Sequence, residues 1–172
     1  MSVSQIGSGL YLSDLDAALN CSVLRSRRVT LIVNCSGRED LRYPPLDGLR
    51  VLHVPVPDRP HAPLDRYFQL VSDEILQNGS GSTLVHCSAG RSRSAAVVMA
   101  HLMRCEGLSL SQSHRRLLER RPFVRPNVGF WRQLMALEQS LFGSASVQMS
   151  ATPAGVLPVL QDAPPRECCV NM

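Results

Sequence analysis

The chain has 172 residues, 44% of them hydrophobic, which is enough for one globular domain with a buried core. Its formal net charge of +4 suits anionic partners, but the basic residues lack the clustering typical of nucleic-acid-binding proteins. The six cysteines are irregularly spaced, and residues 1–8 contain no apolar signal core. No run approaches the ~20 apolar residues that span a bilayer. These features predict a protein of the cytoplasm, or also of the nucleus.

The first third of the chain predicts a short strand, a short helix and two further strands. Gly9–Leu12 is expected to form a short strand, and Leu15–Leu19 a short capped helix. Val29–Val33 is β-branched and aliphatic throughout, which is typical of a strand buried on both faces of a sheet. A polar, proline-containing loop then leads to another strand at Val51–Val56.

Helices dominate the remainder. Apolar residues at helical spacing from Leu64 onward predict a helix with one face against the sheet, and Ala95–Met103 is apolar all round, which indicates deep burial. Two more capped helices are expected over residues 109–119 and 127–141. Residues 144–172 show no period and are expected to be a disordered tail. The elements together predict a single α/β domain with a central, mostly parallel twisted sheet flanked by helices.

One loop joins the strand at 82–85 to the buried helix, and it carries the candidate chemistry. Its sequence is His86-Cys87-Ser88-Ala89-Gly90-Arg91-Ser92-Arg93-Ser94. The five residues between Cys87 and Arg93 can turn their N–H groups inward and form, with the positive end of the helix, a cup for a phosphate dianion. The same field lowers the pKa of a cysteine at the floor of the cup, so Cys87 is the candidate nucleophile. Arg93 can hold two phosphoryl oxygens at once.

This loop resembles the signature of the cysteine-dependent protein tyrosine phosphatase superfamily, and its Ser-Arg-Ser ending followed by alanines is most similar to the dual-specificity branch. From roughly Ile6 to Phe142 the chain resembles an atypical dual-specificity phosphatase. The resemblance also includes three other segments: Val54-Pro55-Val56-Pro57-Asp58, His61-Ala62-Pro63, and Arg125-Pro126-Asn127 followed by Gly129-Phe130-Trp131. It implies a catalytic domain over residues 1–143 and a phosphate-binding loop between a strand and a buried helix.

A phosphomonoesterase also needs a proton donor for the leaving oxygen. Asp58 is the candidate, because it follows a strand, as the loop with Cys87 does, and occupies the place where this family carries its general acid. The alternative is a turn-forming aspartate, in which case His61 or Asp65 would be the next candidates. The expected reaction passes through a phosphocysteine and requires no metal or cofactor.

Three further residues are expected to support the site. Ser94 can donate its hydroxyl to the sulfur of Cys87, although a helix N-cap serine would look the same. His86 can hold the shape of the loop through backbone hydrogen bonds, or can be a plain buried histidine. By resemblance, Asn127 braces the loop that carries Cys87, although helix capping alone would explain it.

Three functions compete at this point. The first is a protein phosphatase acting on phosphotyrosine and on phosphoserine or phosphothreonine. The second is a phosphatase of a non-protein anion, such as a phosphoinositide or an RNA 5′ phosphate, because Arg91 adds a cation to the loop. The third is a phosphoprotein-binding module, against which the joint presence of Cys87, Arg93 and Asp58 argues.

The C-terminus offers the one route to a membrane. Cys169 lies four residues from the end and Met172 is a residue that favours farnesyl transfer, but Asn171 is unusual there and no basic run precedes the site. Membrane association is expected only if Cys169 is prenylated, and stable anchoring would also need palmitoylation of Cys168.

Overall fold

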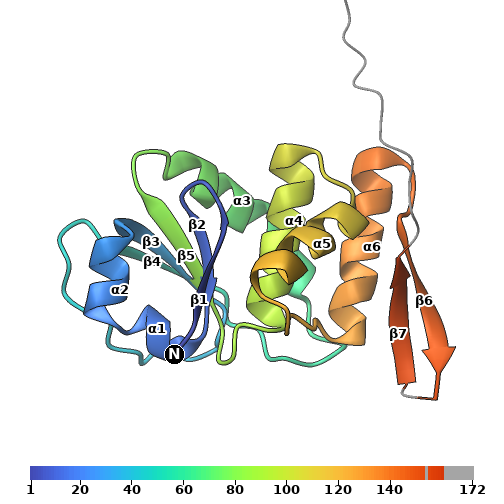
Figure 1. The fold of residues 1–172 in the computed structure, drawn as a ribbon, viewed down its shortest axis with the longest axis horizontal. Helices are drawn as coiled ribbons and strands as arrows, with labels where there is room; N and C mark the ends of the chain where they lie inside the picture. The colour runs from blue at the N-terminus through green and yellow to red at the C-terminus, as the bar shows by residue number, and fades with distance from the viewer. Residues whose placement is uncertain (154, 161–172) are drawn as a thin grey trace, which may run out of the picture.

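A five-stranded sheet with strand order β1-β2-β5-β3-β4 forms the centre of the protein (Figure 1). The computed structural model describes residues 1–153 and 155–160. Within this sheet β1 and β2 pair antiparallel and the other neighbouring strands pair parallel, which confirms the mostly parallel sheet. The strands are β1 (Val3–Gly7), β2 (Leu10–Ser13), β3 (Val29–Asn34), β4 (Arg50–His53) and β5 (Ser82–His86). The strand predicted over Val51–Val56 is therefore shorter and ends at His53.

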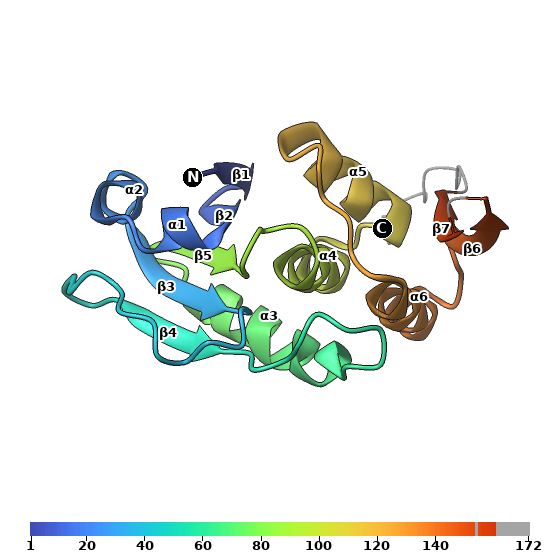
Figure 2. The same cartoon turned by 90° about the horizontal axis from the view of Figure 1, so that it is seen from below.

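Helices cover both faces of the sheet (Figure 2). The short helices α1 (Leu15–Ala18) and α2 (Cys21–Ser26) cover one face, where Ile32 and Leu84 point into a small apolar cluster. Leu31, Val33 and Val85 point into the larger cluster on the opposite face. The alternation explains why β3 and β5 are apolar at successive positions, since both of their faces are buried. The other helical elements are η1 (Leu64–Tyr67), α3 (Phe68–Gln77), α4 (Arg93–Glu106), α5 (Leu110–Arg120) and α6 (Val128–Phe142).

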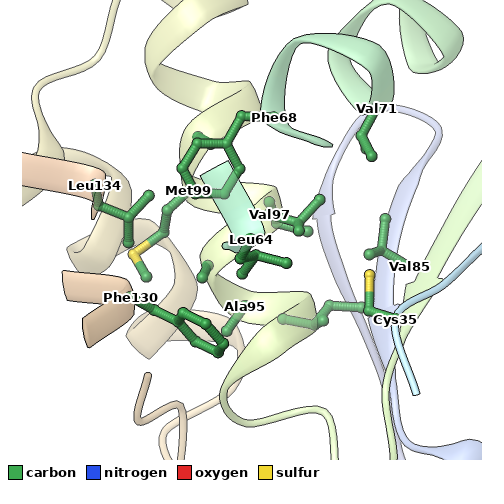
Figure 3. Close-up of a cluster of buried hydrophobic side chains, with 14 of the residues drawn as sticks. Cys35, Leu64, Phe68, Val71, Val85, Ala95, Val97, Met99, Phe130 and Leu134 are labelled. Carbon is green, nitrogen blue, oxygen red and sulfur yellow. The ribbon is translucent and has the colours of Figure 1, made fainter. Parts of the chain in front are cut away.

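Helix α4 lies at the centre of the larger cluster. Every residue from Ser94 to Met103 is buried, as expected for a helix that is apolar all round. Figure 3 shows its Ala95 and Met99 beside Phe130 and Leu134 of α6, all of them buried. Each fully buried large apolar side chain contributes about 1.5–3 kcal/mol. This packing fixes the direction in which the N-terminus of α4 points.

The residues after α6 depart from the prediction. Instead of a disordered tail starting at 144, strands β6 (Val147–Thr152) and β7 (Gly155–Leu160) pair as an antiparallel hairpin beside α6 (Figure 1). The buried carboxylate of Glu138 anchors it by accepting hydrogen bonds from the backbone N–H and the hydroxyl of Ser146, at 2.7 and 2.6 Å. The prediction rested on composition, which does not register the ladder hydrogen bonds or this anchor.

The lipidation sites lie outside the described residues. Cys168 and Cys169 fall within residues 161–172, so prenylation of Cys169 stays a prediction. Across the described ranges, every helix is too short or too polar to cross a bilayer.

Candidate active site

The strand register brings the candidate residues to one edge of the sheet. Ser13, His86, Asn34 and His53 lie side by side at the C-terminal ends of β2, β5, β3 and β4. The loops that follow these strands therefore meet at that edge, where sites of open α/β sheets are found. The loop from β5 to α4, which carries Cys87, is in the middle.

Cys87 lies at the floor of this loop and is 3% exposed. Its Sγ atom is 3.1 Å from Ser94 Oγ and accepts a hydrogen bond of 3.2 Å from the N–H of Gly90. Burial alone raises the pKa of Cys87, but hydrogen bonds from the Ser94 hydroxyl and from the N–H groups of Ser94, Gly90 and Arg91 outweigh it. The net effect lowers the pKa of Cys87 and favours a thiolate.

Four carbonyl groups of the loop, those of residues 88–91, accept hydrogen bonds from outside the loop. The oxygen of Ser88 accepts from Leu15 N at 3.0 Å, and that of Arg91 accepts from Arg125 N at 2.8 Å. Between them, the carbonyls of Ala89 and Gly90 accept from one guanidinium, that of Arg121. Four consecutive carbonyls directed outward leave the N–H groups of the loop free to turn inward, which is the arrangement of an anion-binding nest.

Gly90 and Arg121 make this arrangement possible. Gly90 has a φ of +69°, and a Cβ atom there would lie 2.5 Å from both Ser13 O and Arg121 Nη2. Arg121 Nε donates to Gly90 O at 2.8 Å, and Nη2 donates to Ala89 O at 3.1 Å and to Ser2 Oγ at 3.0 Å. Arg121 is only 1% exposed, although a charged residue near the end of a polar helix is normally solvated. Nothing in the sequence pattern separates it from its neighbour Arg120, which is exposed.

Arg93 is fixed at one end and open at the other. Its Nη1 atom donates to the carbonyls of Ser36 and Val56, at 2.8 and 3.2 Å, while Nη2 reaches Ser88 Oγ only at 3.4 Å. Its Nε atom is buried and lacks a hydrogen-bond partner among the described residues. The edge of the guanidinium that carries Nε and Nη2 therefore has donors left for an anionic ligand.

Asp58 stands opposite the loop, on the segment that follows β4. Its Oδ1 atom accepts from Ser92 Oγ at 2.7 Å and from Asn127 Nδ2 at 2.9 Å. The backbone N–H of Asn127 also donates to Ser92 Oγ, at 3.0 Å, and Asn127 Oδ1 caps α6 by accepting from Phe130 N. Asn127 therefore makes both contacts that the sequence left open, the helix cap and the contact with the loop of Cys87.

These residues enclose a cavity of about 270 Å³. Its lining consists of Asp58, Cys87, Ser88, Ala89, Arg91, Ser92, Arg93, Phe123 and Arg125. His61 and Asp65, the alternative acids, are exposed and are not among the residues that line it. The cavity thus brings together the thiol, the guanidinium and one carboxylate.

His86 and Ser94 also occupy defined positions. His86 Nδ1 is 2.9 Å from Cys87 O, and because a carbonyl only accepts, Nδ1 carries the proton and Nε2 accepts from Tyr43 OH at 2.7 Å. Burial lowers the pKa of His86, which keeps the ring neutral. Sequence reasoning missed Tyr43, because it lies in a loop that looked merely polar. The N-cap of α4 is Ser92, so Ser94 is not the capping residue.

The described residues contain no group of three or more His, Cys, Asp or Glu side chains that could hold a metal ion.

The comparisons with known proteins agree on one family. Residues 10–140 match the family described as dual specificity phosphatase, catalytic domain. Human dual specificity protein phosphatase 14 is 41% identical over 159 residues, covering 91% of this chain and 79% of the relative, and human dual specificity protein phosphatase 18 is 38% identical over 164 residues, covering 91% and 83%. Among solved structures, human DUSP28 aligns with a TM-score of 0.76 at 35% identity, covering 81% of this chain and 94% of the other.

Proposed function

The chain belongs to the dual specificity phosphatase family and is a cysteine-dependent protein phosphatase, and on that premise we propose the part that each site residue takes in the reaction. Cys87 is the nucleophile, the loop Ser88-Ala89-Gly90-Arg91-Ser92 with Arg93 binds the phosphoryl group, and Asp58 is the general acid. The observation that carries this proposal is the sulfur of Cys87 under inward N–H groups, with a lowered pKa and beside the open edge of Arg93.

The reaction has two steps. In the first, the Cys87 thiolate attacks phosphorus, an S–P bond forms, the P–O bond to the substrate breaks, and Asp58 gives its proton to the leaving oxygen. In the second, water attacks the phosphocysteine while Asp58 takes a proton from that water. Inorganic phosphate leaves and the thiolate is restored. The Ser94 hydroxyl, 3.1 Å from Sγ, stabilises the thiolate as it departs.

Arg93 presents two N–H groups to the phosphoryl oxygens. Because the carbonyls of Ser36 and Val56 hold Nη1, the edge that carries Nε and Nη2 remains for the ligand. Two parallel bonds from this edge can follow two equatorial oxygens into the transition state, where their charge develops. The residues beneath the loop, His86 and Arg121, touch no reacting atom and keep the loop in shape.

The substrates are phosphorylated proteins, and we propose that both phosphotyrosine and phosphoserine or phosphothreonine are accepted. The presence of Arg91 does not favour a non-protein substrate. Its guanidinium lies 5.3 Å from the ring centroid of Phe123 at the wall of the cavity, where it can contact a phosphoprotein equally well. The free thiols at Cys21, Cys35, Cys87 and Cys105 support a reducing compartment, the cytoplasm or the nucleus.

Three variants test the assignment. Cys87→Ser should abolish turnover of a phosphotyrosine peptide but keep affinity for vanadate, because the nest and Arg93 remain. Arg93→Ala should lose both, and Cys105→Ser, an exposed thiol outside the cavity, should behave as wild type. Turnover by Cys87→Ser near the wild-type rate would rule out Cys87 as the nucleophile.

A further inference from the structure

A second cavity adjoins the catalytic one. It measures about 430 Å³ and lies between α5, α6 and β7. Its walls are mainly apolar, and the residues that matter most here are Leu118, Val124, Trp131, Val156, Leu157 and Pro158. Three residues, Asp58, Ser92 and Arg125, line both cavities, so the two cavities lie side by side at these residues.

The shared residue Asp58 indicates on which side of the catalytic cavity the second cavity lies. In the proposed reaction Asp58 protonates the leaving oxygen, which is the side-chain oxygen of the substrate's own phosphorylated residue. The substrate polypeptide therefore continues on the Asp58 side of the phosphorus atom. Asp58 is also in the wall of the second cavity, so this cavity lies on the side toward which the substrate polypeptide continues.

The chemistry of the walls indicates what fits. His114 lines the cavity, its ring packs edge-on against Trp131 with centroids 4.8 Å apart, and burial lowers its pKa, so it is a neutral group. Of the residues that line the cavity, Arg125 carries the cation and Asp58 the anion, both of them on the boundary shared with the catalytic cavity. The interior consequently suits an uncharged, apolar side chain.

We propose that this second cavity is a substrate subsite that takes an apolar side chain close to the phosphorylated residue of a protein substrate. The proposal rests on the proposed function, because the direction of the substrate follows from the role of Asp58. Strand β7 supplies one wall through Val156, Leu157 and Pro158, and Figures 1 and 2 show the hairpin beside α6. The C-terminal hairpin is thereby part of substrate recognition.

Peptide preference is the first test. Phosphotyrosine peptides that carry Leu, Ala or Glu at one flanking position at a time, on either side of the phosphotyrosine, are assayed with the full chain. At one position or more, Leu should give a kcat/KM about tenfold above Ala, as burial of one apolar side chain allows, and Glu should fall below Ala. p-Nitrophenyl phosphate, which has no flanking residues, reports the chemistry alone.

A matched pair of variants on β7 is the second test. Val156 and Val159 are 45% and 48% exposed, but only Val156 lines the cavity. Val156→Glu should remove most of the preference for Leu, mainly through KM, while Val159→Glu should keep it. Both variants should hydrolyse p-nitrophenyl phosphate as wild type does. Leu157→Ala, which shortens another wall residue without adding charge, should weaken the preference in the same direction.

The outcomes separate the two proposals. Wild-type protein that hydrolyses p-nitrophenyl phosphate and the peptides without any flanking preference overturns the subsite and leaves the proposed function intact. Equal losses in Val156→Glu and Val159→Glu, or an equal loss on p-nitrophenyl phosphate, assign the hairpin to folding and also overturn the subsite. Wild-type protein without activity on any of these substrates overturns the proposed function, and the subsite with it.

Discussion

Ser92 Oγ donates a hydrogen bond of 2.7 Å to Asp58 Oδ1, so the phosphate-binding loop itself holds the candidate acid in place. The two residues are 34 positions apart. Asn127, at the start of α6, contacts both of them: its backbone N–H donates to Ser92 Oγ and its Nδ2 donates to Asp58 Oδ1. The acid and the loop are thus in one hydrogen-bonded unit. The other carboxylate oxygen of Asp58 is the atom we expect to carry the proton.

Asp58→Asn should lower kcat/KM on a phosphopeptide by roughly 10²–10⁴, the usual contribution of general acid catalysis. The loss should be distinctly smaller on an activated aryl phosphate, because a good leaving group hardly needs a proton. Asp65→Asn is the control. Equal losses on both substrates would make Asp58 a structural residue, and a leaving-group-dependent loss in Asp65→Asn would transfer the role.

Ser94→Ala should shift the titration of Cys87. The Ser94 hydroxyl is one of the hydrogen bonds that lower the pKa of Cys87 against the raising effect of burial, so removing it raises that pKa. The rate of iodoacetamide alkylation should therefore reach its midpoint at a higher pH. The wild-type midpoint in Ser94→Ala would contradict the assigned bond.

Hydrolysis of the intermediate should slow in the same variant. Without the Ser94 hydroxyl, the departing thiolate loses its donor at 3.1 Å. Rapid-quench measurements with a good leaving group should show phosphocysteine accumulating in Ser94→Ala. A wild-type level of phosphocysteine would contradict a role for Ser94 in the second step.

Arg121→Lys should weaken phosphate binding without touching the phosphate. A lysine cannot hold Gly90 O and Ala89 O as the guanidinium does, and buried acceptors without a donor cost about 1–3 kcal/mol each. We expect a lower Tm, a lower kcat and a weaker affinity for vanadate. Arg120→Lys, one position earlier and exposed, is the matched control. Wild-type vanadate affinity in Arg121→Lys would contradict the claim that Arg121 maintains the conformation of the phosphate-binding loop.

Gly129→Ala should displace the loop that carries Asp58. A Cβ atom at Gly129, in the first turn of α6, would overlap the backbone of Pro60, two residues from Asp58. The expected result is a lower Tm and a loss of kcat that is larger for phosphopeptides than for activated aryl phosphates. Gly79→Ala is the control, because a Cβ atom there makes only an ordinary contact of 3.8 Å. Identical losses on both substrates would mean that Gly129 matters for stability alone.

The sequence predicts those parts of the protein whose cause is local. The strand before Cys87, the buried helix after it and the caps at Ser109 and Asn127 follow from periodicity and side-chain type, and all four are present. The family resemblance added Asp58, whose position depends on two loops that meet only in the folded chain.

What the sequence could not predict depends on contacts between distant segments. Arg121 reaches Gly90 across 31 positions, and Tyr43 reaches His86 across 43, with no periodicity or motif to indicate either contact. The hairpin was missed because its composition resembles a linker, whereas its anchor is the buried Glu138 on another element. All three contacts involve polar groups whose partners are set by tertiary structure.

Because the four outward carbonyls of the phosphate-binding loop are held by distant segments, the loop keeps its catalytic shape only when the whole domain is folded. Their donors are Leu15 at the start of α1, Arg121 after α5 and Arg125 before α6, and Arg121 in turn rests on Ser2 and Ser4 of the N-terminal segment. The cup cannot be assembled by its own nine residues, and a partially unfolded chain with a frayed N-terminus would lose it. Phosphate binding should consequently be lost in the same cooperative transition in which the chain unfolds, at one temperature and one denaturant concentration.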